Sequence, residues 1–215
     1  MNGELTGAPD ASVPRKTRAA TTADVVAALS QRRRTPAAVW GMVVLLVSET
    51  MLFAAFIATY VFLWSQSDAW PPSGIPDPGV WRQVLPVGCL VLAGVPVEMS
   101  WRACRSGRPA AAVSLLGVAL VVQCGYLAYQ VAAMADDLDR FSPSTNAYGS
   151  IYYLLVGADH AHVGVGLLLS LWIGLRLGSG LTTSRANALQ AISWYWHGVN
   201  ALTVIVVVTI LAPVW

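Results

Sequence analysis

Five separate apolar segments, each long enough to cross a lipid bilayer, constrain this chain more than any other feature. They cover residues 38–64, 80–101, 109–134, 150–176 and 188–214. A helix rises 1.5 Å per residue, so about 20 apolar residues cross a hydrocarbon core roughly 30 Å thick. The bilayer core has no water to pair with backbone groups, so a single segment can cross it only as a helix or as part of a closed barrel. The pattern predicts an all-α, polytopic membrane bundle with five transmembrane helices.

Composition excludes the ordinary soluble classes. Hydrophobic residues make up 56% of the chain and charged residues only 11%, which is far from the balance of a soluble domain. The three cysteines, Cys89, Cys104 and Cys124, have neither an even count nor metal-type spacing. We therefore expect no disulfide framework and no zinc site.

The basic residues are segregated along the chain, which predicts its orientation. Eleven of the thirteen Lys and Arg lie in residues 1–35, in the loop 102–108 and in the loop 176–185. By the positive-inside rule these parts lie in the cytoplasm, so the N-terminus is expected inside and the C-terminus outside. Residues 1–35 are expected to form a disordered basic cytoplasmic tail, and residues 36–215 the membrane domain. The arginines at 32–34 precede a span, which favours a role in topology over nucleic-acid binding.

The fourth segment carries three ionisable residues inside its apolar run, Asp159, His160 and His162. A charge at the centre of a membrane helix costs on the order of 3 kcal/mol, so such a group normally faces protein or water. Small side chains also recur every four residues along this segment, interrupted by one histidine: Ala158, His162, Gly166, Ser170, Gly174 and Gly178. Small ridges allow membrane helices to approach closely, so we expect this helix to be central in the bundle.

Polar residues of three segments are predicted to lie at a similar depth. Counting the helical rise from each end brings together Glu49, Asp159, His162 and His197. Three interpretations remain open: a hydrogen-bonded layer that fixes helix register, a haem or metal site between His162 and His197, and a proton-conducting element. The aromatic residues 194–196 are expected in an interfacial belt.

Four sequence features carry a resemblance to a known family. They are Ser48-Glu49-Thr50-Met51-Leu52-Phe53-Ala54, the run Gly157-Ala158-Asp159-His160-Ala161-His162-Val163-Gly164-Val165-Gly166, the run Trp194-Tyr195-Trp196-His197-Gly198-Val199-Asn200, and Gln130. Together they resemble subunit III of the haem-copper respiratory oxidases, the cytochrome c or quinol oxidases, in the five-helix form without two leading helices. Four positions depart from the family pattern: Asp159 replaces His, His160 replaces Gly, Asn200 replaces Asp and Ala133 replaces Glu.

The resemblance implies a non-catalytic accessory subunit in a bacterial cytoplasmic membrane. It implies packing on the catalytic subunit I, with subunits II and IV as further partners, and haem and copper held by those partners rather than by this chain. It also implies structural phospholipids in a cleft, and support for proton uptake and for the stability of the complex. On this basis the expected lipid headgroup contacts are Arg176, Arg185 and Trp194. The expected buried polar layer contains Glu49, Asp159, His162, His197 and Asn200, with Gln130 as a further family-matched polar residue.

Three other functions remain as alternatives. The first is the related subunit that accompanies nitric oxide reductases. The second is a haem-binding membrane electron carrier that uses His162 and His197. The third is a proton transporter that depends on Glu49. The residues leave open whether the parent enzyme takes electrons from cytochrome c or from quinol.

Overall fold

The computed structural model describes residues 37–180 and 182–214, and all regular structure within these ranges is helical. The helices are α2 (Ala37–Ser65), α3 (Val80–Arg105), α4 (Pro109–Leu138), α5 (Ala147–Gly178) and α6 (Thr183–Leu211), followed by the 3-10 helix η1 (Ala212–Val214). All five α-helices are long and apolar enough to cross a membrane. The prediction of an all-helical, five-span bundle is confirmed for this part of the chain. The predicted tail, residues 1–35, lies outside the described residues.

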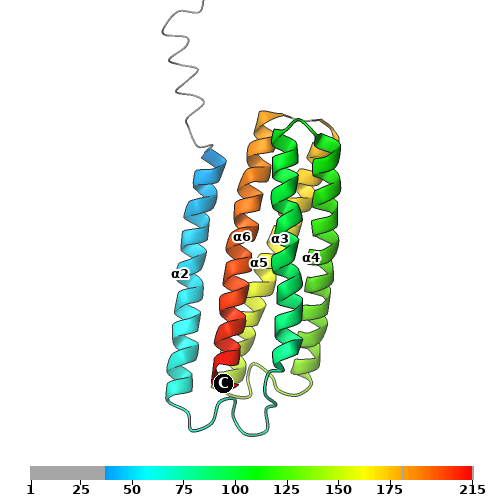
Figure 1. The fold of residues 1–215 in the computed structure, drawn as a ribbon. Coiled ribbons are helices and arrows are strands. Elements are labelled where there is room, and N and C mark those ends of the chain that lie inside the picture. The colour runs from blue at the N-terminus through cyan, green and yellow to red at the C-terminus, as the bar shows by residue number, and fades with distance from the viewer. Residues whose placement is uncertain (1–36, 181, 215) are drawn as a thin grey trace, which may run out of the picture. The chain divides into compact units, whose positions relative to one another are not determined.

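Four of the helices form a closed ring, and the fifth packs on its outside. Helix α3 contacts α4 and α6, and α5 contacts the same two helices from the opposite side of the ring. Helix α2 packs against α5 and α6 (Figure 1). Within the ridge of small residues on α5, Gly166 lies against Trp196 and Gly174 lies against Leu116, whereas Gly178 is exposed. Helices α5 and α6 belong to the ring and also contact α2.

Local signals explain where several helices begin. The side chain of Asn146 accepts a hydrogen bond from the Gly149 amide, 2.8 Å away, and caps α5. Thr182 caps α6 in the same way through the amide of Arg185. Helix α4 opens on Pro109, whose missing N–H is not needed in a first turn. These caps satisfy backbone donors at the helix starts, where no intrahelical partner exists.

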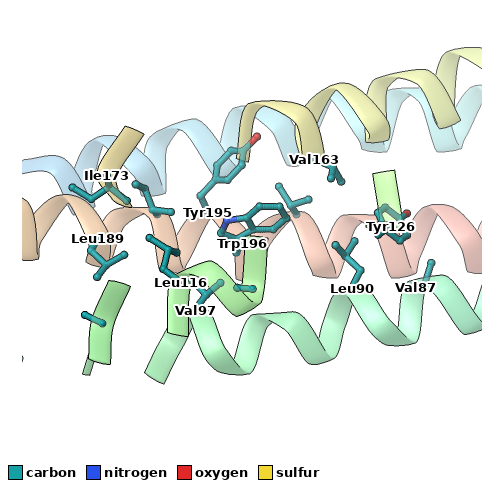
Figure 2. Packing of buried hydrophobic residues seen from close by; sticks show 14 of the residues in the cluster. Val87, Leu90, Val97, Leu116, Tyr126, Val163, Ile173, Leu189, Tyr195 and Trp196 are labelled. Carbon is teal, nitrogen blue, oxygen red and sulfur yellow. The ribbon is translucent and has the colours of Figure 1, made fainter. Parts of the chain in front are cut away.

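The core of the ring is organised around Trp196. Figure 2 shows this side chain among the buried residues of α3 to α6. Its indole nitrogen donates to the Ser170 hydroxyl at 2.8 Å, and a Cβ added at Gly166 would lie 2.8 Å from its ring. Trp196 is 0% exposed and Tyr195 is 2% exposed. The expectation of an interfacial aromatic belt was therefore wrong for both residues, and only Trp194 is exposed.

A second polar tie joins α3, α4 and α5 at the end of the bundle where α3 begins. Arg82 donates to the Asp137 carboxylate at 2.8 Å and to the Ala133 carbonyl at 2.7 Å. The hydroxyl of Tyr152 donates to the other Asp137 oxygen at 2.8 Å. Because one carboxylate accepts from two neighbouring helices, this contact fixes the register of all three.

Candidate functional site

Glu49 of α2 and His162 of α5 form a direct contact within the membrane domain. The Nε2 atom of His162 lies 2.8 Å from Oε2 of Glu49. Both side chains are mostly buried, at 18% exposure for His162 and 22% for Glu49. The ring of Phe53 packs edge-on against the imidazole, and the Tyr195 hydroxyl donates to the His162 carbonyl at 2.8 Å. The histidine is thus held by α2, α5 and α6 together.

The second nitrogen of His162 determines how protons are arranged in this pair. Nδ1 lies 2.6 Å from the Ala158 carbonyl oxygen. A carbonyl oxygen can only accept, so Nδ1 must donate. The contact between Nε2 and Glu49 then holds one proton: a carboxylic acid donates to a neutral imidazole, or an imidazolium donates to a carboxylate. The pair can therefore keep one proton in either of two positions.

Asp159 lies three residues from His162 but turns to a different neighbour. Its Oδ1 accepts from the Thr203 hydroxyl of α6 at 2.7 Å, and the residue is only 4% exposed. Nearby on α4, the Gln130 amide donates to the Tyr126 hydroxyl at 3.3 Å. Three of the four residues predicted to lie at one depth are therefore divided between two neighbouring contacts, and Asp159 accepts from a hydroxyl rather than from His162.

His197 belongs to a separate cluster on the opposite side of α6. Its Nε2 atom lies 3.9 Å from Oε2 of Glu98. Oε1 of Glu98 accepts from Arg102 Nε at 2.8 Å, and Oε2 accepts from the Ser193 hydroxyl at 2.9 Å. The cluster thus contains one carboxylate, one guanidinium, one hydroxyl and one imidazole. It joins the last turns of α3 to the first half of α6.

This cluster lies at the polar end of a groove between α3 and α6. The groove has a volume of about 700 Å³. Its walls are mostly apolar, with polar groups from Glu98, Arg102, His197 and Asn200. Gly94 brings the two helices close, since a Cβ there would lie 2.9 Å from the Asn200 amide nitrogen. The Oδ1 atom of Asn200 is buried and has no hydrogen-bond partner in the described part of the chain.

The residues predicted to contact lipid headgroups lie elsewhere. The guanidinium of Arg176 stacks over the ring of Trp172, with 5.1 Å to the centroid. Arg185 donates to the Gly180 carbonyl in the turn before α6. Trp194 is 48% exposed. None of the three lines the α3–α6 groove, and Glu49 does not line it either.

Two residues of the groove, Glu98 and Arg102, have no functional role predicted from the sequence, which places Arg102 in the basic loop 102–108. In the structure α3 continues to Arg105, so both residues are helical and one turn apart. The sequence signal was their spacing of four residues, which places opposite charges on one helix face.

Comparisons with known proteins agree on one family. A family model described as cytochrome c oxidase subunit III matches residues 31–214. The wheat (Triticum aestivum) cytochrome c oxidase subunit 3 is 28% identical over 180 residues, covering 80% of this chain and 66% of the wheat protein. The protein of the same name from Synechocystis sp. is 27% identical, covering 80% of this chain and 73% of that protein. A probable cytochrome c oxidase subunit 3 from Nocardia farcinica is 29% identical, covering 74% and 80%.

The coverage differs between these relatives. The matched region spans 66% of the wheat protein, which is slightly less than two thirds of its length, and the same share of the Arabidopsis thaliana protein. The match to this chain covers all five helices.

Proposed function

The chain belongs to the cytochrome c oxidase subunit III family, and from this premise we propose that it is an accessory subunit of a haem-copper terminal oxidase. Its five apolar helices fit a multi-pass membrane protein, here proposed to lie in a bacterial cytoplasmic membrane. In this role the chain packs on the catalytic subunit I, with subunits II and IV as further partners. The family match over residues 31–214 is the observation that carries the proposal.

We propose that the redox chemistry belongs to the partner subunits. In residues 37–180 and 182–214, no three His, Cys, Asp or Glu side chains converge as a metal-binding group. His162 uses both ring nitrogens, one for Glu49 and one for the Ala158 carbonyl. His197 lies in the α3–α6 groove beside Glu98. These positions favour an accessory role over a haem-binding electron carrier.

Phospholipid binding is the second part of the proposal, and the α3–α6 groove is its site. The groove offers apolar walls from Val91, Val95, Met99 and Val204 and a polar end at Arg102. A lipid needs both features, because its acyl chains are apolar and its phosphate is an anion that a guanidinium binds well. Arg102 is the headgroup contact proposed for this groove, and the headgroup contacts expected at Arg176, Arg185 and Trp194 lie outside it.

Support for proton uptake is the third part, and it involves Glu49 and His162. Titratable residues buried within membrane helices, such as Glu49 of α2 and His162 of α5, are candidates for a functional role by default. The two positions available to the proton between them keep the net charge of the pair at zero in either arrangement. We propose that the pair stabilises the complex and sustains proton uptake by the catalytic subunit during turnover.

A pull-down in mild detergent from the native membrane tests the assignment. Partners are identified by mass spectrometry, and haem is measured by visible absorbance on the same eluate. Haem-copper subunits I and II in the eluate support the proposal, and their type identifies the electron donor. Nitric oxide reductase subunits in their place, or a lone chain with its own haem band, would overturn it.

A further inference from the structure

We infer that Glu98 determines which lipid headgroup the α3–α6 groove accepts, and that this headgroup carries a primary ammonium, as in phosphatidylethanolamine. Arg102 binds the phosphate in this arrangement, and Glu98 binds the ammonium. The inference rests on the proposed function, because it takes the groove to be a lipid site in a bilayer. It adds the chemical class of the ligand and the residue that selects it.

The dimensions of the groove fit a lipid of a single leaflet. Along α3 it runs from Val91 to Arg102, which is about 16 Å at the helical rise of 1.5 Å per residue. The hydrocarbon core of a bilayer is roughly 30 Å thick, so this length is about one half of it. Acyl chains lying along Val91 and Val95 would place their headgroup at Arg102. The ligand is therefore a leaflet lipid with its polar end at the Glu98 cluster.

Arg102 has donors left for a phosphate. Its Nε atom is used by Glu98, and its side chain is 71% exposed. The two terminal nitrogens of the guanidinium donate to no residue in the described part of the chain. A guanidinium presents paired N–H groups that match two phosphate oxygens. His197, 58% exposed on the facing helix, adds a ring nitrogen to the same end of the groove.

Glu98 has acceptor capacity left for an ammonium. Each carboxylate oxygen accepts one described hydrogen bond, from Arg102 or from Ser193. A carboxylate oxygen has two lone pairs, so each can accept one further donor. The side chain is 24% exposed and lines the groove. A primary ammonium with three N–H donors can therefore reach it beside the bound phosphate.

The charges of the cluster separate the common headgroups. Glu98 and Arg102 give one negative and one positive charge, which complement a zwitterion. A phosphoglycerol headgroup supplies an anion for Arg102 but leaves Glu98 beside a second negative charge, which is unfavourable. A phosphocholine headgroup has a cation without N–H donors, so it cannot hydrogen-bond the carboxylate. Phosphoethanolamine satisfies both residues.

The experiment measures lipid retention by the full chain in its purified complex. The complex is delipidated and incubated with mixed micelles holding equal amounts of phosphatidylethanolamine, phosphatidylglycerol and phosphatidylcholine with identical acyl chains. Lipids retained after washing are counted per chain by mass spectrometry. The wild type should retain phosphatidylethanolamine about fivefold over each competitor, the upper range for one partly exposed ion pair.

Three variants separate the roles of the two residues. Glu98→Gln keeps the size of the side chain and should reduce the preference to near onefold while lipid is still retained. Arg102→Gln should lower retention of all three lipids. Arg102→Lys keeps the positive charge and should preserve the preference for phosphatidylethanolamine. Asp136→Asn, an exposed carboxylate at the far end of α4, is the matched control and should behave as the wild type.

The outcomes are distinct from those of the proposed function. An equal preference in wild type, a preference for phosphatidylglycerol, or an unchanged preference in Glu98→Gln would each overturn the inference, even when oxidase subunits copurify. Selectivity that disappears in Glu98→Gln would support it, even if the partners prove to be other than an oxidase. Unfolding of Glu98→Gln is detected by its gel-filtration profile, and the preference of the wild type among the three lipids then carries the test, since an equal preference overturns the inference.

Discussion

The carboxylate of Glu49 and the imidazole of His162 meet at 2.8 Å, which joins α2 to α5 by a single polar contact inside the membrane domain. Three residues away on α5, Asp159 turns instead to Thr203 of α6. Helix α5 thus uses two adjacent turns to hold two different neighbours.

Removing either partner of the Glu49–His162 contact should destabilise the attachment of α2. Glu49→Ala and His162→Ala each leave a buried polar group without its partner, at a cost of about 1–3 kcal/mol. The measurement is the free energy of unfolding by SDS, followed by tryptophan fluorescence. The double variant should be less destabilised than the sum of the two single variants, since the contact is lost only once. Strict additivity would show that the two residues are not coupled.

Gly166→Ala should loosen the core around Trp196. The added Cβ would lie 2.8 Å from the indole ring, and overpacking of this kind costs about 1–3 kcal/mol. The matched control is Gly164→Ala, two residues away on the same helix, where a Cβ would meet nothing within 4 Å. Unfolding curves in SDS compare the two. Equal stability of both variants would contradict the packing described around Trp196.

Thr203→Val should destabilise the contact between α5 and α6. The substitution keeps the shape of the side chain but removes the 2.7 Å hydrogen bond from the Thr203 hydroxyl to Asp159, which is 4% exposed. Loss of one partner of a buried polar group costs about 1–3 kcal/mol. Thr209→Val is the control, because that hydroxyl bonds only the Ile205 carbonyl of its own helix. Thermal stability in detergent, read by gel filtration, should fall for the first variant and stay nearly constant for the second.

Arg82→Gln should weaken the tie between α3, α4 and α5. Asp137 would lose its cationic partner, and the Ala133 carbonyl would lose a donor. A hydrogen bond to a charged group contributes about 1.5–3 kcal/mol. Arg140→Gln, an exposed arginine close to this end of the bundle, serves as the control. Limited proteolysis of the loop 66–79 should become faster in Arg82→Gln only, and equal rates would argue against the tie.

In the aromatic run 194–196, residue type alone predicts the wrong environment for two of the three side chains. Tryptophan and tyrosine near a span end are typical of an interfacial belt. Here Tyr195 and Trp196 face the ring instead, because Gly166 and Ser170 of α5 leave space and a hydrogen-bond acceptor for the indole. That space belongs to another helix, so the local sequence of α6 does not reveal it.

The basic-residue rule still predicts that the N-terminus lies in the cytoplasm. It acts through the charge of the loops during insertion, which is a property of the sequence. The helices themselves have the same packing in either orientation.

By itself the sequence determined that the chain forms five apolar helices. Hydropathy and length are local properties, and a long apolar segment in a bilayer must satisfy its own backbone hydrogen bonds. The sequence also predicts a similar depth for Glu49, Asp159, His162 and His197, because the depth counted along a helix depends only on the rise per residue. Only the tertiary structure decided which of these groups meet. Successive residues are rotated by about 100° around the helix axis, so each side chain points in a different direction. Which neighbouring helix lies in that direction depends on how the helices pack. The packing of the helices brings His162 to Glu49 and Asp159 to Thr203. At the end of the groove, Glu98 binds Arg102 of its own helix and Ser193 of α6.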